Sequence, residues 1–322
     1  MDKITLLVIS NPAGKHLKRL NELKQPVEIH VGNDPEFLAK HAPDADVILV
    51  GGVRPDLLHG AFPLAQRVRW VHVLWAGVEK ILSPELIASP VPLTNGRGVF
   101  RNSLAEFALA SILYFAKDFR RLVRNQEAGR WEQFDVTEVR GQVFGVVGYG
   151  EIGRAAASLA HAIGMRVHAV RRRAGGSSSE PIVERLYSPS ELHEMLPECD
   201  YVLVATPLTD ETRGMIGEAE FAVMKPSAVI INVGRGPVIV ESALIEALEH
   251  DKIKGAALDV FDTEPLPTRH SFYRLSNVLL SPHSADHTVG WINLAMDLFI
   301  ANFELFRNGQ PLKNIVDKHA GY

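Results

Sequence analysis

The first hundred residues alternate short apolar runs with polar segments rich in turn-forming residues. The runs contain many branched side chains and are bounded by Gly, Pro, Asn and Asp, a pattern typical of short strands. This pattern predicts strands at Ile4–Ile9, Val27–Val31, Val47–Val50 and Val68–Leu74. Because helical stretches separate these runs, we expect a parallel α/β sheet, although nothing in this region resembles a phosphate-binding loop.

A long helical pattern follows. It begins near Ser103, a residue suited to cap a helix, and Glu106 three residues later completes a capping box. Apolar side chains then recur at helical spacing, at Leu104, Phe107, Ala108, Ile112 and Phe115. We interpret this helix as the crossing from a first domain into a second.

From Gln142 onward, strands and helices alternate regularly. The predicted strands are Val143–Val147, Val167–Val170, Tyr201–Ala205, Val229–Val233, Ile253–Leu258 and Val278–Leu280. The predicted helices are Ile152–Ile163, Ser190–Leu196, Glu218–Met224 and Glu241–Glu249. This order is typical of a doubly wound dinucleotide-binding sheet.

A final predicted helix, Val289–Phe306, leads to Lys313–Asp317, a tail that has no strand–helix unit left to complete. We therefore expect the tail to pack back onto the first domain. The predicted fold is α/β with two doubly wound parallel sheets. A Rossmann cofactor domain over residues 103–288 is inserted into a flavodoxin-like substrate domain over residues 1–102 and 289–322.

Composition narrows the function classes. The chain has 322 residues, of which 46% are hydrophobic and 22% are charged, as expected for a globular protein with two domains. A formal charge of −4 gives no reason to expect a nucleic-acid partner. The apolar run at the N-terminus is too short for a signal peptide or a membrane span. The single cysteine, Cys199, is expected to be a small half-buried residue, and the reducing cytoplasm is the expected location.

A glycine motif follows the first strand of the second domain, as Gly148-Tyr149-Gly150-Glu151-Ile152-Gly153. With a strand before it and a helix after it, this motif predicts a dinucleotide pyrophosphate site. The first glycine would allow the tight turn, the second would let the backbone approach the phosphates, and the third would let helix and strand pack closely. The helix N-terminus would supply N–H donors. A glycine-rich turn without a ligand is the weaker alternative.

The next strand of such a domain normally ends in an acid that binds the adenosine ribose. Here the strand ends in Arg171-Arg172-Arg173. Guanidinium groups bind a 2′-phosphate, which a carboxylate would repel. We therefore predict NADP(H) as the preferred cofactor with NAD still usable, against the alternative of a solvated charge run.

Three further strands each deliver one polar residue where they end, namely Arg235, Glu264 and His283. The carboxyl ends of parallel strands form the ligand-binding edge of the sheet. Beside a nicotinamide, His283 would protonate a carbonyl oxygen, Glu264 would keep the imidazole charged, and Arg235 would hold a substrate carboxylate. Each residue alone has a structural explanation, as an ordinary histidine, a turn residue or a loop cap. Together they predict the reduction of a small 2-oxo acid.

These motifs resemble the D-isomer-specific 2-hydroxyacid dehydrogenases, the family of glyoxylate and hydroxypyruvate reductases and D-3-phosphoglycerate dehydrogenase. The resemblance covers nearly the whole chain. It also rests on Leu74–Glu79, Asn95–Val99, Thr206–Thr212 and Asp259–Pro265. It implies that Arg235, Glu264 and His283 are catalytic.

The resemblance implies further binding residues. Ala76 and Gly77 would offer backbone N–H groups to the substrate carboxylate. Trp75, where the family often has a small residue, would either narrow the pocket or lie against the substrate. Beyond the glycine motif and the arginine run, the cofactor would contact Thr206, Pro207, Thr212, Val233, Gly234, Arg235, Asp259, His283 and Ala285. Asp259 would accept a hydrogen bond from the nicotinamide carboxamide, or else cap a strand as a buried acid.

The leading hypothesis is an NADPH-dependent reductase of a small 2-oxo acid. A dinucleotide-sensing interaction protein of the corepressor type is the alternative, because such proteins share the fold and keep the same three polar residues. The chain lacks the disordered tail that such a partner-binding role favours. Thirteen histidines show no zinc spacing, so no metal is expected. Apolar surface around Tyr114, Phe115 and Phe119, together with the resemblance, predicts a homodimer through the cofactor domain.

Overall fold

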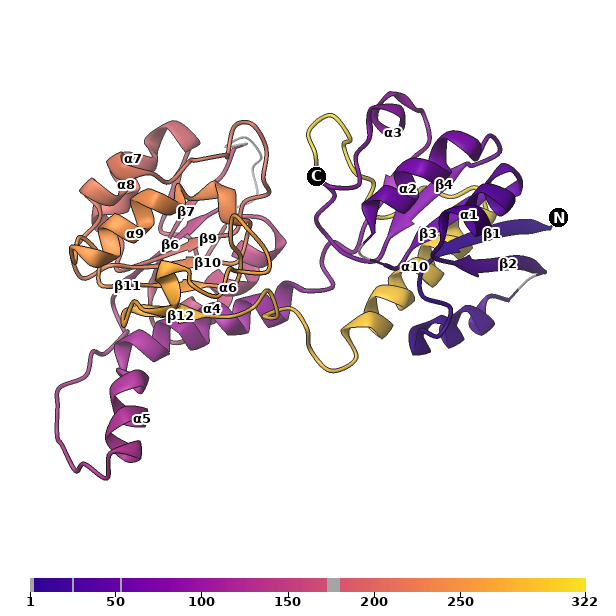
Figure 1. Cartoon of the computed structure of the whole chain (residues 1–322). Coiled ribbons are helices and arrows are strands. Elements are labelled where there is room, and N and C mark those ends of the chain that lie inside the picture. The colour runs from indigo at the N-terminus through magenta and orange to yellow at the C-terminus, as the bar shows by residue number, and fades with distance from the viewer. Residues whose placement is uncertain (1–2, 25, 53, 173–179) are drawn as a thin grey trace. The chain divides into compact units, whose positions relative to one another are not determined.

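The computed structural model describes residues 3–24, 26–52, 54–172 and 180–322, and it divides into two compact units. Unit 1 contains residues 1–99 and 289–322, and unit 2 contains residues 100–288 (Figure 1). Among the described residues, no helix has the length and apolar character needed to cross a bilayer.

Unit 1 has a five-stranded parallel sheet in the order β2-β1-β3-β4-β5, the flavodoxin-like order. The strands are β1 (Ile4–Ile9), β2 (Val27–Gly32), β3 (Val47–Val50), β4 (Trp70–Val73) and β5 (Leu93–Thr94). One face packs against α1 (Pro35–His41), α2 (Pro55–Ala61) and α3 (Pro84–Ala88). The other face packs against η1 (Lys15–Glu22) and α10 (Trp291–Arg307). The C-terminal tail returns to β5, where Val316 N–H donates to Leu93 O, as predicted.

Unit 2 has a seven-stranded parallel sheet in the order β12-β11-β10-β9-β6-β7-β8, a Rossmann order with one added strand. The strands are β6 (Val143–Val147), β7 (Arg166–Val170), β8 (Arg185–Tyr187), β9 (Tyr201–Val204), β10 (Val229–Asn232), β11 (Gly255–Leu258) and β12 (Val278–Leu280). The order reverses between β6 and β9, the topological switch point at which dinucleotides bind such sheets.

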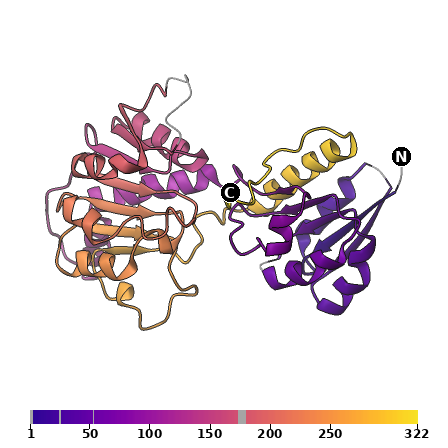
Figure 2. The same ribbon diagram turned by 90° about the horizontal axis from the view of Figure 1, so that it is seen from above.

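Helices cover both faces of this second sheet (Figure 2). On one side α4 (Arg101–Ala116) packs along α6 (Glu151–Ala162). On the other side, α7 (Leu192–Met195), α8 (Glu218–Val223) and α9 (Glu241–Glu249) contribute to one apolar core. The remaining helix, α5 (Phe119–Glu127), and the segment after it extend away from the sheet (Figure 1).

Several sequence predictions need correction. The helix predicted from Ser103 begins at Arg101 without a side-chain cap, and Ser103 Oγ donates to Ala285 O, so the capping box was wrong. The helix predicted at 190–196 is split into 3-10 and α turns, because Pro189 and Pro197 cannot donate backbone hydrogen bonds. Cys199 is completely buried rather than half-buried, and burial raises the pKa of its thiol to about 12.

Candidate active site

The glycine motif forms the turn between β6 and α6. Gly148 has a φ of +101°, and a β-carbon there would lie 2.8 Å from the Ala205 backbone. A β-carbon on Gly153 would lie 2.4 Å from Gly148 O. These two glycines therefore serve the turn and the close packing of helix against strand. Gly150 differs, because its absent β-carbon would meet nothing within 4 Å.

The space beside Gly150 is suited to a dinucleotide pyrophosphate. Among the described residues no side chain caps α6, so its first N–H groups can donate to phosphate oxygens. On the neighbouring loop after β9, the Thr206 hydroxyl is buried without a hydrogen-bond partner in the described chain. A β-carbon on Gly234 would lie 2.7 Å from Thr206 O, so the loops after β9 and β10 lie in close contact.

The arginine run begins directly after β7. Arg171 Nη1 lies 3.4 Å from Glu180 Oε1, and Arg172 Nη1 lies 3.2 Å from Glu211 Oε2. Both guanidinium groups thus contact acids of the chain itself. The third predicted phosphate ligand, Arg173, lies outside the described residues.

The loop after β9 is held by its own side chains. Thr212 Oγ1 donates to Pro207 O at 2.6 Å and accepts from Thr209 N–H at 2.8 Å. The hydroxyl of Thr212, a predicted cofactor contact, is therefore used to shape the loop.

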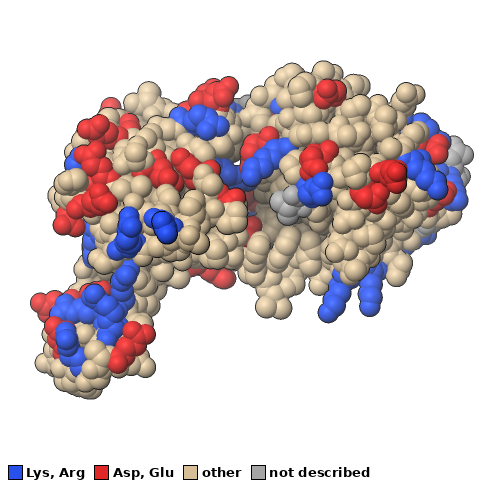
Figure 3. All heavy atoms as spheres, viewed as in Figure 1, with Lys and Arg blue, Asp and Glu red and all other residues tan. Residues whose placement is uncertain are grey.

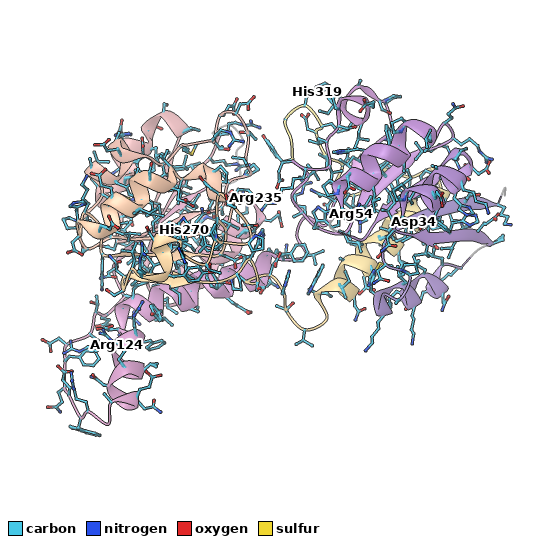
Figure 4. The ribbon with its side chains drawn as sticks, in the orientation of Figure 1. Asp34, Arg54, Arg124, Arg235, His270 and His319 are labelled. Carbon is cyan, nitrogen blue, oxygen red and sulfur yellow. The ribbon has the colours of Figure 1, made fainter. Side chains whose placement is uncertain are left out.

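The loop after β10 carries Arg235. Asn232 Oδ1 accepts from Gly234 N–H at 3.0 Å, and Asn232 Nδ2 donates to Arg235 O at 3.1 Å. The Asn232 side chain therefore fixes the backbone from which Arg235 projects. Figure 4 labels Arg235. Arg235 Nη1 donates to Gly234 O at 2.8 Å. Val233 is buried at the end of β10.

Glu264 and His283 meet as the sequence predicts. His283 Nδ1–H donates to Glu264 Oε2 at 2.8 Å, while Glu264 Oε1 accepts from Phe261 N–H at 3.0 Å. The hydrogen bond to Glu264 raises the pKa of His283, against the opposing effects of burial and of the Arg235 charge. The pair therefore favours a protonated imidazole whose Nε2 is left for another acceptor.

Asp259, at the end of β11, organises the segment that carries His283. Its Oδ1 accepts hydrogen bonds from Ser281 Oγ at 2.5 Å, Ser284 N–H at 2.9 Å and Ala285 N–H at 3.0 Å. Two of these donors flank His283, whose own φ is +52°. The Asp259 carboxylate thus holds a left-handed backbone in place, a role that sequence reasoning did not separate from cofactor binding.

The predicted substrate loop belongs to unit 1 and follows β4. Asn95 Nδ2 donates to Ala76 O at 2.6 Å, and Gly96 N–H donates to Trp75 O at 2.9 Å. Asn314 Nδ2, in the C-terminal tail, donates to Arg97 O at 2.7 Å. Both bonds on the loop go to carbonyl oxygens. Within the described chain, the Ala76 and Gly77 N–H groups take no part in these hydrogen bonds, and Trp75 is partly buried against both cores of unit 1.

Two residues near the glycine motif were missed from the sequence. Arg154, on the first turn of α6, forms an ion pair with Glu180 Oε2, and its guanidinium carbon lies 4.7 Å from the centre of the Tyr149 ring. Twenty-six residues separate the pair, so no local pattern reveals it. No three metal-ligating side chains gather anywhere in residues 3–24, 26–52, 54–172 and 180–322.

Comparisons with known proteins agree with this geometry. Residues 109–285 match the family model for the NAD-binding domain of the D-isomer specific 2-hydroxyacid dehydrogenases. The chain is 34% identical over 293 residues to glyoxylate reductase of Thermococcus gammatolerans, covering 88% of this chain and 86% of that protein. It is 35% identical over 297 residues to glyoxylate/hydroxypyruvate reductase B of an Enterobacter species, covering 89% and 90%.

Among solved structures, an NADPH-dependent glyoxylate/hydroxypyruvate reductase of Sinorhizobium meliloti, in complex with NADP and sulfate, superposes with a TM-score of 0.86. It is 26% identical, and the match covers 99% of this chain and 100% of that one. The glycine motif, the paired Glu264 and His283 and these matches lead to one conclusion: the chain belongs to the D-isomer specific 2-hydroxyacid dehydrogenase family.

Proposed function

We propose that this protein is an NADPH-dependent reductase of a small 2-oxo acid of the glyoxylate or hydroxypyruvate type. The observation that carries the proposal is the 2.8 Å hydrogen bond between His283 and Glu264, in the unit that holds the dinucleotide motif. The names of the two relatives and of the Sinorhizobium structure support the substrate class, and that structure's NADP supports the cofactor.

In the proposed reaction, His283 Nε2 donates its proton to the carbonyl oxygen of the substrate. Glu264 holds the ring through Nδ1 and sustains its charge. Arg235 binds the substrate carboxylate and polarises the carbonyl, a task that suits a planar guanidinium. When bound, the reduced nicotinamide supplies the hydride for the carbonyl carbon.

The proposed binding residues follow the same division. We propose that Ala76, Gly77 and Trp75 of unit 1 contact the substrate. For the cofactor we propose Gly148–Gly153, Arg171, Arg172, Thr206, Pro207, Val233, Gly234 and Ala285. For Asp259, whose Oδ1 already accepts three hydrogen bonds, we propose support of the His283 segment as the main role.

The direct test is oxidation of NADPH and NADH, followed at 340 nm, with a panel of 2-oxo acids. We expect turnover with glyoxylate and hydroxypyruvate and a higher kcat/KM with NADPH than with NADH. Equal or better use of NADH would contradict the cofactor preference. An absence of turnover with every acid would favour the dinucleotide-sensing alternative, which none of the comparisons supports.

Glu264→Gln should shift the pH dependence of this reaction. The amide keeps the shape of the side chain but removes the charge that raises the pKa of His283. The protonated, active imidazole is then lost at a lower pH, so the basic limb of the kcat/KM profile should move to lower pH while activity survives in acid. A basic limb that stays in place would contradict the assigned pairing.

We also propose that the protein is a cytoplasmic homodimer assembled through the cofactor domain. Phe115 of the helix predicted to form the interface is buried within unit 2, which corrects that part of the prediction. Apolar surface lies on the projecting arm, defined as α5 and residues 128–140, which begins at the predicted Phe119. Phe119 is 43% exposed, Val123 is 53% exposed and Trp131 is 95% exposed. An ion pair of 2.6 Å between Arg121 and Glu132 links α5 to the segment that follows it. The visible face of the arm carries many charged side chains of both signs (Figure 3).

Light scattering should therefore give about twice the chain mass of 35.5 kDa at micromolar concentration. Trp131→Ser should weaken the dimer, because a fully exposed indole in the monomer is expected to be buried by the partner. The matched control is Tyr273→Ser, which removes an exposed aromatic ring elsewhere in unit 2. A wild-type protein of monomer mass would contradict the assembly.

A further inference from the structure

Two arginines contact the same carboxylate beside the glycine motif. Arg154 from α6 donates to Glu180 Oε2, and Arg171 after β7 lies 3.4 Å from Glu180 Oε1. The Glu180 side chain is only 15% exposed, although both arginines reach solvent. The Tyr149 ring lies beside the Arg154 guanidinium, and burial and then the charge of Glu180 raise the pKa of its phenol. Each oxygen of Glu180 thus has its own guanidinium partner.

This arrangement is a receptor for an anion with several oxygens. Two guanidinium groups that each contact a different oxygen can hold a phosphate monoester as well as a carboxylate. The guanidinium group of Arg154 lies over the Tyr149 ring, with its carbon 4.7 Å from the ring centre. Tyr149 itself is almost completely buried, so one wall of the receptor is rigid.

The place of the receptor identifies the anion. In a Rossmann domain the residue that follows the second strand lies at the ribose of the adenosine half. Arg171 occupies that position, and Arg154 follows the third glycine of the phosphate-binding motif. A 2′-phosphate on that ribose would therefore arrive where the Glu180 carboxylate now lies.

We propose that Arg154, Arg171 and Tyr149 form the receptor for the 2′-phosphate of NADP(H), and that Glu180 is an internal carboxylate that competes with this phosphate. The inference rests on the proposed function, because it deepens the cofactor preference. When NADP(H) binds, the two guanidinium groups give up their contacts with the Glu180 carboxylate and contact the 2′-phosphate instead. Only the difference in free energy between these two sets of contacts adds to the affinity for NADP(H). Glu180 thereby lowers the ratio of the affinity for NADP(H) to the affinity for NAD(H).

The second candidate role for Glu180 is that of the missing ribose acid, which would favour NAD(H). The contacts argue against it, because both carboxylate oxygens already face cations rather than open space. The two roles predict opposite results when the charge of Glu180 is removed.

The experiment is calorimetric titration of adenosine 2′,5′-bisphosphate and of 5′-AMP into the wild type and Glu180→Gln. These probes differ only in the 2′-phosphate and need no turnover. We expect Glu180→Gln to tighten the bisphosphate about tenfold and to leave 5′-AMP within about twofold, since a charged competitor is worth roughly one or two charge-assisted hydrogen bonds. Arg154→Met, which keeps an unbranched apolar side chain but removes the guanidinium, should weaken the bisphosphate about tenfold and leave 5′-AMP unchanged.

Glu184→Gln is the matched control. Glu184 forms a two-point ion pair with Arg166, at 2.7 Å for both contacts, at the opposite end of β7. Its loss removes the same charge from the same segment between β7 and β8, and both probes should bind as they do to the wild type.

Two results would overturn the proposal: weaker binding of both probes to Glu180→Gln, which would make Glu180 a ribose ligand, or unchanged binding of the bisphosphate. If Glu180→Gln does not fold, a crystal structure of the wild type with the bisphosphate decides. An intact Arg154–Glu180 contact in that complex would overturn the proposal, and its loss would support it. If the wild type binds NADP⁺ no more tightly than NAD⁺, only the proposed cofactor preference is contradicted. The ratio of the bisphosphate affinities of Glu180→Gln and the wild type still measures the competition between Glu180 and the 2′-phosphate.

Discussion

His283→Ala is expected to lower kcat for the reduction of a 2-oxo acid by roughly 10²–10⁴ wherever the wild-type imidazole is protonated, because it removes the proton donor. The loss should shrink on the basic limb of the profile, where the wild-type imidazole has itself lost its proton, and no other group in the pair can take over. Glu264 would keep its bond from Phe261 N–H, but it is an acceptor when ionised. Single-turnover oxidation of bound NADPH with glyoxylate measures the chemical step directly.

His287→Ala is the matched control for this substitution. His287 is an exposed imidazole four residues further on, and its Nε2 lies 3.5 Å from Asp286 Oδ1. We expect its kcat to stay within about twofold of the wild type, as for most surface substitutions. Near-normal turnover in His283→Ala would show that another group supplies the proton and would refute the mechanism.

Gly153→Ala is expected to destabilise unit 2 by about 2–4 kcal/mol, in the upper range of single substitutions. The added β-carbon would lie 2.4 Å from Gly148 O and 2.8 Å from Val146 Cγ1, so helix α6 would have to move away from β6. Calorimetry of thermal unfolding should show a lower Tm for the transition of unit 2, by roughly 2–4 °C per kcal/mol.

Gly150→Ala separates architecture from ligand binding. Nothing lies within 4 Å of the added β-carbon, and the φ of −94° suits any residue. We expect an unchanged Tm and weaker binding of both NADP⁺ and NAD⁺, because the methyl group would enter the space proposed for the pyrophosphate. Wild-type affinity in Gly150→Ala would refute that space as the phosphate site, and an unchanged Tm in Gly153→Ala would refute the packing role.

The sheets and most of their bounds could be predicted because buried parallel strands are nearly continuous apolar runs. Ile4–Ile9, Val47–Val50, Val143–Val147 and Val278–Leu280 were predicted to the residue. The meeting of Glu264 with His283 was predictable for a related reason, since strand ends converge on one edge of a sheet.

Other features depend on contacts that leave no local pattern. The capping box at Ser103 failed because the serine hydroxyl instead reaches Ala285, 182 residues away. Of the arm, only Phe119 was predicted as apolar surface, because the other exposed apolar side chains there have no core within their own unit to give them a clear pattern. The Arg154–Glu180 pair was hidden by distance along the chain.

The left-handed backbone at His283 has a consequence for how this chain can evolve. A φ of +52° costs a residue with a β-carbon roughly 1–2 kcal/mol, and glycine or asparagine is better suited to it. In a lineage that no longer needed a proton donor, position 283 would therefore drift toward those residues early, with a gain in stability. Asp259 would be retained, because its three hydrogen bonds hold the segment whatever side chain stands there. A descendant with Gly or Asn at position 283 and an intact glycine motif would be a dinucleotide-binding protein without reductase activity.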